Sequence, residues 1–123
     1  MKSPNKIGVI SDIHSNLPAL EAVFDDMPDV DTVVCAGDVV GYGPWPSECV
    51  ERVREECSVV VQGNHDRLVD SPWVYNNRVA RKGLKHSKEE LSSDQIEWLN
   101  DLPPSKIAFE DRLLVTHRDR KSV

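Results

Sequence analysis

The chain alternates short apolar runs with stretches in which apolar residues recur at helical spacing. Runs rich in valine and isoleucine occur at residues 6–10, 31–36 and 59–61, and each is bounded by polar residues or glycine. Runs of this length and composition predict buried strands. Two more strands are predicted at residues 107–109 and 112–116, separated by a polar pair as in a hairpin. The pattern therefore predicts three early strands and a late hairpin.

Helical periodicity fills the segments between the first three strands. Apolar residues follow helical spacing over residues 17–27, with Ser15 and Asn16 as candidate N-caps. A second helix is predicted after Ser47, which is expected to cap it, and Cys57 is expected to be the last residue of its apolar stripe. Because a helix separates each strand from the next, we expect parallel strand pairs and an α/β fold.

Two further helical segments follow the third strand. Residues 73–88 carry many basic side chains, which could help to hold a phosphate but are more typical of a solvated helix surface. Ser92 and Gln95 have the spacing of a capping box, and the helix that they begin is expected to end before residues 103–104, which are both proline. The loop at residues 42–46 is aromatic and rigid, and it could either wall a pocket or simply pack.

Side chains that bind metal ions or transfer protons follow four of the predicted strands. They are, in chain order, Asp12, His14, Asp38, Asn64, His65, Asp66 and His117. The carboxyl ends of parallel strands meet at one edge of a sheet, so these residues are expected to converge there. Carboxylate, imidazole and amide ligands without thiolate suit manganese, iron or zinc at a two-metal hydrolytic centre.

The spacing within these groups suggests separate tasks. Asp12 and His14 are two residues apart, so an extended backbone would place both side chains on one face. Asp38 has two carboxylate oxygens that can reach two metal ions. Asn64 and Asp66 are predicted to lie in a loop that follows Gly63. Ordinary polar turns remain the alternative for each group, because Asn, Gly and Asp are common turn residues.

Composition narrows the choice of function. The chain has 123 residues, a net charge of −6 and a pI of about 5.1, which argues against binding to nucleic acid or to an anionic membrane. It contains no apolar run as long as a membrane span. Cys35, Cys49 and Cys57 are odd in number and lack C-x-x-C spacing, which favours a reducing, cytoplasmic location.

Three blocks in order carry a resemblance to a known family. Residues 12–14, 37–41 and 63–66 resemble the D-x-H, G-D-x-x-G and G-N-H-D blocks of the calcineurin-like metallophosphoesterases. Residues 115–117 look like the strand and histidine of the family's next block, and residues 11–23 look like its small prokaryotic phosphodiesterase branch. The resemblance covers nearly the whole chain, and three ordered blocks are far more specific than any one of them.

The resemblance implies an αββα sandwich with a βαβαβ N-terminal half. It also implies hydrolysis of a phosphodiester or phosphomonoester by a hydroxide held between two divalent ions, with manganese, iron, zinc and nickel as candidates. The implied metal ligands are Asp12 and His14 for the first ion, Asp38 for both, and Asn64 and His117 for the second. His65 would stabilise the transition state or protonate the leaving oxygen, and Asp66 would orient His65.

Two departures from the family pattern affect this interpretation. Arg118 stands where the family usually has glycine, and the later G-H-x-H block, whose histidines complete both metal sites, has no counterpart. We therefore expect residues 1–123 to be one metallophosphoesterase domain that is truncated at its C-terminus, with an incomplete second sheet. An exposed sheet edge would favour a homo-oligomer.

The expected substrate is a small phosphorylated molecule, and neither nucleic acid nor a membrane is expected as a stable partner. The alternative is a metal-binding fragment or subunit that lacks the C-terminal histidine block and is catalytically incompetent.

Overall fold

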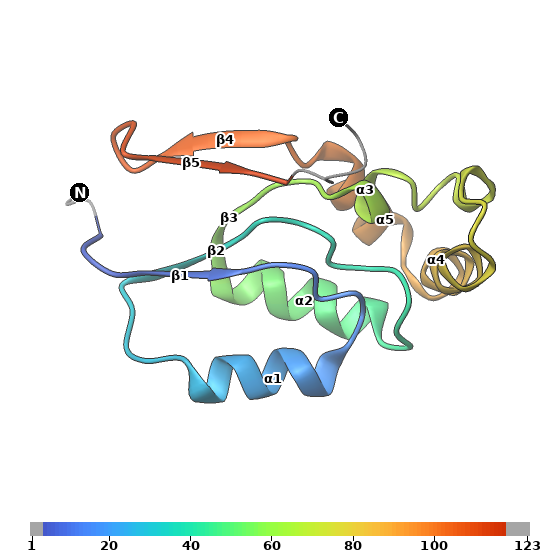
Figure 1. Ribbon diagram of the computed structural model, residues 1–123, viewed down its shortest axis with the longest axis horizontal. Coiled ribbons are helices and arrows are strands. Elements are labelled where there is room, and N and C mark those ends of the chain that lie inside the picture. The colour runs from blue at the N-terminus through green and yellow to red at the C-terminus, as the bar shows by residue number, and fades with distance from the viewer. Residues whose placement is uncertain (1–3, 118–123) are drawn as a thin grey trace.

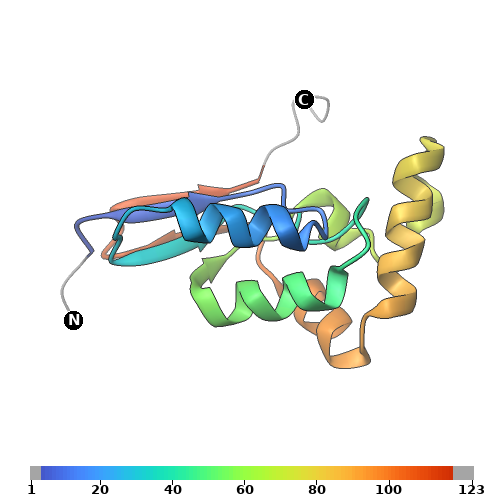
Figure 2. The same ribbon diagram turned by 90° about the horizontal axis from the view of Figure 1, so that it is seen from below.

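The computed structural model of the chain describes residues 4–117. Three layers are visible in Figures 1 and 2: a pair of helices, a three-stranded parallel sheet and a two-stranded antiparallel hairpin. The helices α1 (Leu17–Asp26) and α2 (Pro46–Glu56) cover one face of the sheet. The strands are β1 (Ile7–Ile10), β2 (Thr32–Cys35) and β3 (Cys57–Val60) in the sheet, and β4 (Ser105–Ala108) and β5 (Leu113–Thr116) in the hairpin.

The predicted βαβαβ arrangement is confirmed. The sheet order is β1-β2-β3, and both pairs are parallel, with Ile7 opposite Thr32 and Cys35 opposite Val60. The α/β class and the late hairpin are confirmed as well, with a second sheet of two strands among the described residues. All three parallel strands therefore deliver the residues that follow them to the same edge of the sheet.

The observed helix boundaries can be compared with the caps predicted from the sequence. Of the two candidates, Asn16 and not Ser15 caps α1, because the Oδ1 of Asn16 accepts a hydrogen bond from the N–H of Ala19 at 3.2 Å. The predicted Ser47 cap is wrong: α2 begins at Pro46, whose fixed φ suits the first helical position and whose missing N–H removes no helical bond. Cys57 is the first residue of β3 and not the last of the helix stripe, because α2 ends at Glu56.

The remaining helices surround the far end of the sheet. They are α3 (Asn64–Arg67), the 3-10 turn η1 (Pro72–Val74), α4 (Arg78–Glu90) and α5 (Ser93–Asp101). The predicted capping box at the start of α5 is confirmed, with Ser92 and Gln95 bonded to each other's backbone N–H at 3.1 and 3.0 Å. The predicted loop at residues 64–66 is instead the first part of a helical turn.

Apolar side chains pack on both faces of the parallel sheet. Leu20 and Val53 belong to the cluster on the helix side, whereas Val115 of β5 packs with Val34 and Val61 on the hairpin side. The outer face of the hairpin carries an exposed apolar pair, Ile107 opposite Leu114. Among the described residues, no helix has the length and apolar character that crossing a membrane requires.

Candidate metal centre

The side chains predicted from the strand ends gather around Asp38, which is buried. Asp38 Oδ2 lies 3.5 Å from Nδ1 of His65 and 3.4 Å from Nε2 of His117. The same oxygen lies 3.7 Å from Nε2 of His14, and that nitrogen lies 3.7 Å from Oδ1 of Asp12. The loops that follow β1, β2 and β3 and the end of β5 therefore meet at one point, as the sequence predicts.

These side chains form two groups of potential metal ligands that share Asp38. The first group consists of His14, Asp38 and His65, and the second consists of Asp12, Asp38 and His117, with the ligand atoms of each group within 4.8 Å of one another. The binding of Asp12 and His14 to the same ion stays a prediction, and their ligand atoms lie 3.7 Å apart. Asn64, the predicted amide ligand, lies beside the second group, with Oδ1 3.1 Å from His117 Nε2.

The two outer histidines have the ring orientation that a metal ligand needs. His14 Nδ1 lies 3.2 Å from the carbonyl oxygen of Val40, and His117 Nδ1 lies 2.8 Å from that of Ala36. A carbonyl oxygen can only accept, so Nδ1 carries a hydrogen, and in the neutral ring the lone pair of Nε2 faces Asp38. The result is a cluster of electron-rich atoms that fits a divalent cation.

Three of these residues have a left-handed backbone conformation. The φ angles are 57° at Asp12, 49° at His14 and 59° at Asp38, a region that non-glycine residues rarely adopt. The N–H groups of Asp12 and His14 donate to the carbonyl oxygens of Gly37 and Asp38 at 3.0 and 2.9 Å. The prediction of an extended backbone at Asp12 and His14 is therefore wrong. The side chains meet because the first loop bonds to the second.

The charge of Asp38 is set by its neighbours. Burial acts to raise the pKa of Asp38, but the His65 imidazole and the His65 backbone N–H outweigh it, so that the pKa lies below its ordinary value. That N–H donates to Asp38 Oδ1 at 3.0 Å. Asp38 is therefore ionised at neutral pH, and Oδ2 is left to face the histidines.

Asp66 is buried, and its carboxylate bonds to the backbone of the segments that carry the centre. Its carboxylate accepts hydrogen bonds from four backbone N–H groups at 2.9 to 3.3 Å. The donors are Asp38, Val39, Val40 and Gly63. Burial raises the pKa of Asp66 to about 6, although the backbone N–H donors act to lower it. Among the described residues the ring nitrogens of His65 have no hydrogen-bond partner, so the predicted orientation of His65 by Asp66 is not seen.

Gly63 gives a direct test of how closely the loops approach each other. A Cβ atom added at residue 63 would overlap Oδ1 and the backbone nitrogen of Asp38. We expect Gly63→Ala to displace Asp38 and to weaken Mn²⁺ binding in calorimetric titrations, with a loss of stability of about 1–3 kcal/mol. Gly8→Ala is the matched control, because a Cβ there meets the flexible end of Met27. Equal Mn²⁺ affinity in both variants would contradict this prediction.

Two aromatic side chains that belong to none of the sequence motifs pack against His65. The rings of Tyr42 and Tyr75 lie with their centroids 5.0 Å from that of His65, and Tyr75 is stacked on it at an interplanar angle of 19°. Tyr42 also contacts the ring of His14 at 5.1 Å, so the loop at residues 42–46 borders the centre. Tyr75 follows η1 and has no local sequence signal, because its contacts depend on how α4 packs.

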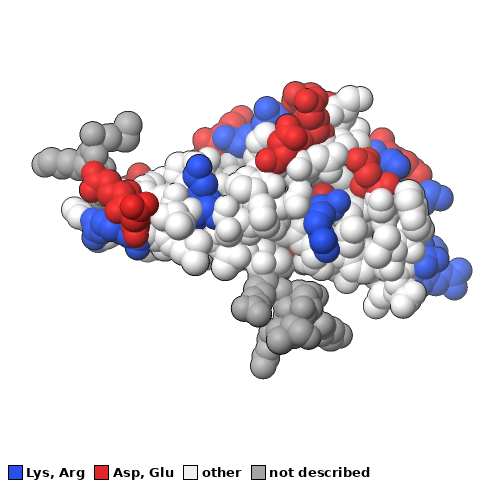
Figure 3. All heavy atoms as spheres, turned by 90° about the horizontal axis from the view of Figure 1, so that it is seen from above, with Lys and Arg blue, Asp and Glu red and all other residues white. Residues whose placement is uncertain are grey.

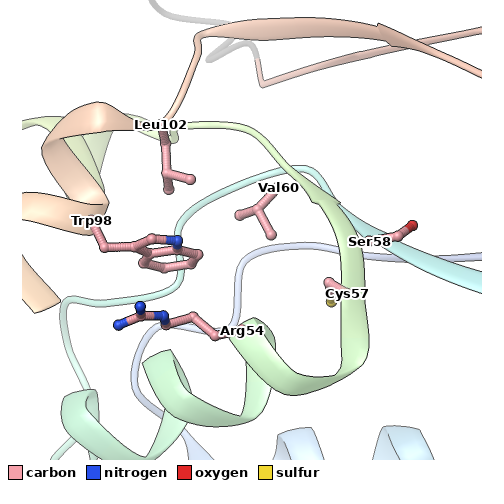
Figure 4. Close-up of a pocket in the computed structure, with 6 residues that line it drawn as sticks. All are labelled: Arg54, Cys57, Ser58, Val60, Trp98 and Leu102. Carbon is pink, nitrogen blue, oxygen red and sulfur yellow. The ribbon is translucent and has the colours of Figure 1, made fainter.

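Within the described part of the chain, one cavity borders the cluster and another lies apart from it. One of about 140 Å³ adjoins Asp12 and is lined by Asn16 and by apolar side chains of β1 and α1. The other, of about 240 Å³, lies beside β3 and contains none of the candidate ligands (Figure 4). There the Arg54 guanidinium lies 5.4 Å from the Trp98 ring centroid and donates to Asp94 at 2.9 Å. That cavity is separate from the polar cluster.

Comparisons with known proteins give matches in sequence and in fold. The family described as calcineurin-like phosphoesterase matches residues 5–122. An uncharacterized protein of Methanocaldococcus jannaschii is 40% identical over 101 residues, which are 79% of this chain and 42% of the relative. The symmetrical bis(5'-nucleosyl)-tetraphosphatase of Erwinia tasmaniensis is 28% identical over 118 residues, which cover 89% of this chain and 42% of the relative.

A solved structure shares both the fold and much of the sequence. The metallophosphoesterase from Sphaerobacter thermophilus superposes with a TM-score of 0.73 at 40% identity, covering 85% of this chain and 44% of that protein. The chain thus spans less than half of the length of each of these three proteins. Arg118, which departs from the family pattern, lies outside the described residues.

Proposed function

The chain belongs to the calcineurin-like phosphoesterase family, and from that premise we propose that it hydrolyses small phosphorylated molecules with the help of two divalent metal ions. The observation that carries the proposal is the position of Asp38. Its Oδ2 lies 3.4 to 3.7 Å from ring nitrogens of three histidines, which come from the loop after β1, from α3 and from the end of β5. Such a cluster of buried and half-buried ligand atoms suits the binding of divalent cations, which supports metal-dependent chemistry at this site.

Each side chain has a place in the proposed reaction. Bound divalent ions would lower the pKa of water and neutralise the charge of the phosphoryl group. The residues that would hold them are Asp12, His14, Asp38, Asn64 and His117. His65, whose ring nitrogens are buried and without a partner among the described residues, can donate a proton to the leaving oxygen. Asp66 would keep the loops of the centre together.

The finer points of the proposal have separate support. The mixture of oxygen and imidazole ligands suits manganese, iron, zinc or nickel, and we take manganese as the first ion to test. The cysteines Cys35, Cys49 and Cys57 are all free thiols, which supports a cytoplasmic location.

The name of the Erwinia tasmaniensis relative supports a nucleotide-like substrate. Acidic and basic side chains are interspersed on the hairpin side of the molecule (Figure 3), a surface better suited to a small substrate than to a nucleic acid.

We further propose that the chain forms the N-terminal portion of the family domain and that it self-associates. The exposed pair Ile107 and Leu114 on the outer face of the hairpin supports self-association. Sedimentation of the chain as a monomer at high concentration would overturn this part of the proposal.

Hydrolysis of bis-p-nitrophenyl phosphate by the 123-residue chain tests the function. We expect turnover with added Mn²⁺, its loss after chelation, and its recovery when Mn²⁺ is restored. Diadenosine tetraphosphate and p-nitrophenyl phosphate under the same conditions separate nucleotide, diester and monoester preferences. A folded chain that binds Mn²⁺ without any turnover would overturn the proposal and would support the catalytically incompetent fragment instead.

A further inference from the structure

The side-chain amide of Asn64 lies between the metal centre and a tyrosine. Its Oδ1 is 3.1 Å from Nε2 of His117, and its Nδ2 donates to the Tyr75 hydroxyl at 2.9 Å. Because Nδ1 of His117 is bonded to a carbonyl oxygen, Nε2 of the neutral ring is an acceptor, and so two acceptors then face each other. With a neutral His117, a cation within reach of both atoms makes this arrangement favourable.

The opposite orientation of the same amide suits a centre without a cation. With the amide turned over, Nδ2 would donate to His117 Nε2 at 3.1 Å and to both Asp38 oxygens at 3.2 Å. Oδ1 would then accept from the Tyr75 hydroxyl at 2.9 Å. An amide nitrogen is not a metal ligand, so Asn64 can serve the centre only in the first orientation.

We propose that Tyr75 is a positioning residue that acts through Asn64, because its hydroxyl accepts the Asn64 N–H when Oδ1 faces a bound cation. The inference rests on the proposed function, since it assumes that a divalent ion binds beside His117. A tyrosine hydroxyl can donate or accept, so it can satisfy the amide in either orientation. Phenylalanine could do neither and would leave Nδ2 without this partner when the ion is bound.

Tyr75 is itself held firmly enough for this task. Nε and Nη2 of Arg81 donate to the Tyr75 carbonyl oxygen at 3.0 and 2.7 Å, and the Tyr75 ring is stacked on His65. Burial raises the pKa of Tyr75, so the hydroxyl stays protonated at neutral pH. Arg81 belongs to the predicted basic face of residues 73–88, and the structure shows its guanidinium bonded to the backbone.

Titration of Mn²⁺ into the chain carrying Tyr75→Phe tests the inference. The phenylalanine ring keeps the stack on His65 and removes only the hydroxyl. We expect the affinity of one of the two ions to fall by roughly 10- to 100-fold, as when an outer partner of a metal ligand is lost. The affinity of the other ion should change little, because its ligands do not include Asn64.

Tyr42→Phe is the matched control. It also removes a tyrosine hydroxyl beside the His65 ring, but no hydrogen bond of that hydroxyl is found among the described residues. We expect its Mn²⁺ affinities to equal those of the wild type. If Tyr75→Phe lowers both affinities together with the unfolding free energy, the role of Tyr75 is only structural and the inference fails. Unchanged binding in Tyr75→Phe also overturns it.

Nuclear magnetic resonance of the Asn64 side-chain amide gives a readout that does not depend on activity. Addition of Zn²⁺ should shift the two amide proton signals of Asn64 in the wild type, because the amide turns from His117 towards Tyr75. In Tyr75→Phe the same Zn²⁺ concentration should produce a smaller shift. A wild type that binds neither Mn²⁺ nor Zn²⁺ would overturn the proposed function together with this inference, whereas binding that is equal in the two proteins overturns the inference alone.

Discussion

Asp38→Asn is expected to abolish metal binding and hydrolysis while leaving the fold in place. Asparagine can keep the hydrogen bond that Oδ1 of Asp38 accepts from the His65 N–H, and it tolerates the left-handed backbone at this position. It removes the negative charge that belongs to both groups of potential ligands. We therefore expect a loss larger than the roughly 100-fold that the loss of an outer-shell partner costs.

The comparison uses kcat/KM for bis-p-nitrophenyl phosphate and calorimetric titration with Mn²⁺, beside thermal unfolding of the same samples. Asp31→Asn is the control, because Asp31 is exposed and bonds only to the backbone of Asn5 and Lys6. A folded Asp38→Asn protein that hydrolyses the diester at the wild-type rate would show that Asp38 binds no catalytic ion.

Asp66→Ala is expected to destabilise the protein more than the loss of any exposed carboxylate. The variant leaves four buried N–H groups of two loops without their acceptor. An unsatisfied buried donor costs about 1–3 kcal/mol, and since the loops can relax we expect a total loss on the order of 4 kcal/mol. Unfolding in urea, at a pH well above the Asp66 pKa of about 6, measures the difference in unfolding free energy.

Asp31→Ala provides the matched comparison for this loss. Asp31 also accepts two backbone N–H bonds, from Asn5 and Lys6, but all these groups are exposed and water can replace the carboxylate. We expect its effect on unfolding to be small. Similar midpoints for Asp66→Ala and Asp31→Ala would mean that the buried N–H groups find other partners and that Asp66 is not what joins the loops.

The sheet and its helices could be predicted because apolar periodicity is a local property of the sequence. The strands around Val9, Val34 and Val59 lie where the hydrophobic runs lie, and the caps at Asn16 and Ser92 follow from side chains that bond to their own neighbours. Such signals need no tertiary context. The loop predicted at residues 64–66 is a helical turn, because Asp66 accepts the N–H of Gly63 within that turn and also bonds to the N–H of Asp38 in the loop after β2.

The composition of the candidate centre was predictable, but its internal geometry was not. Asp12 and His14 lie close together because of left-handed backbone and bonds to another loop, neither of which an alternating pattern reveals. Asp66 belongs to the right block, yet its partners are backbone groups that carry no sequence signal. Tyr75 reaches Asn64 only through the packing of η1 and α4, so no reading of nearby residues could have found it.

The left-handed backbone at the ligand positions also constrains how the chain can evolve. At residue 38 the backbone is most easily adopted by glycine, asparagine or aspartate, and of these aspartate alone offers two charged oxygens to two cations. Histidine at position 14 meets only the chemical requirement, because an imidazole can bind a cation but adopts the left-handed backbone only with strain. A lineage released from selection for activity would therefore be expected to drift towards glycine or asparagine at these positions and to gain stability as it does so.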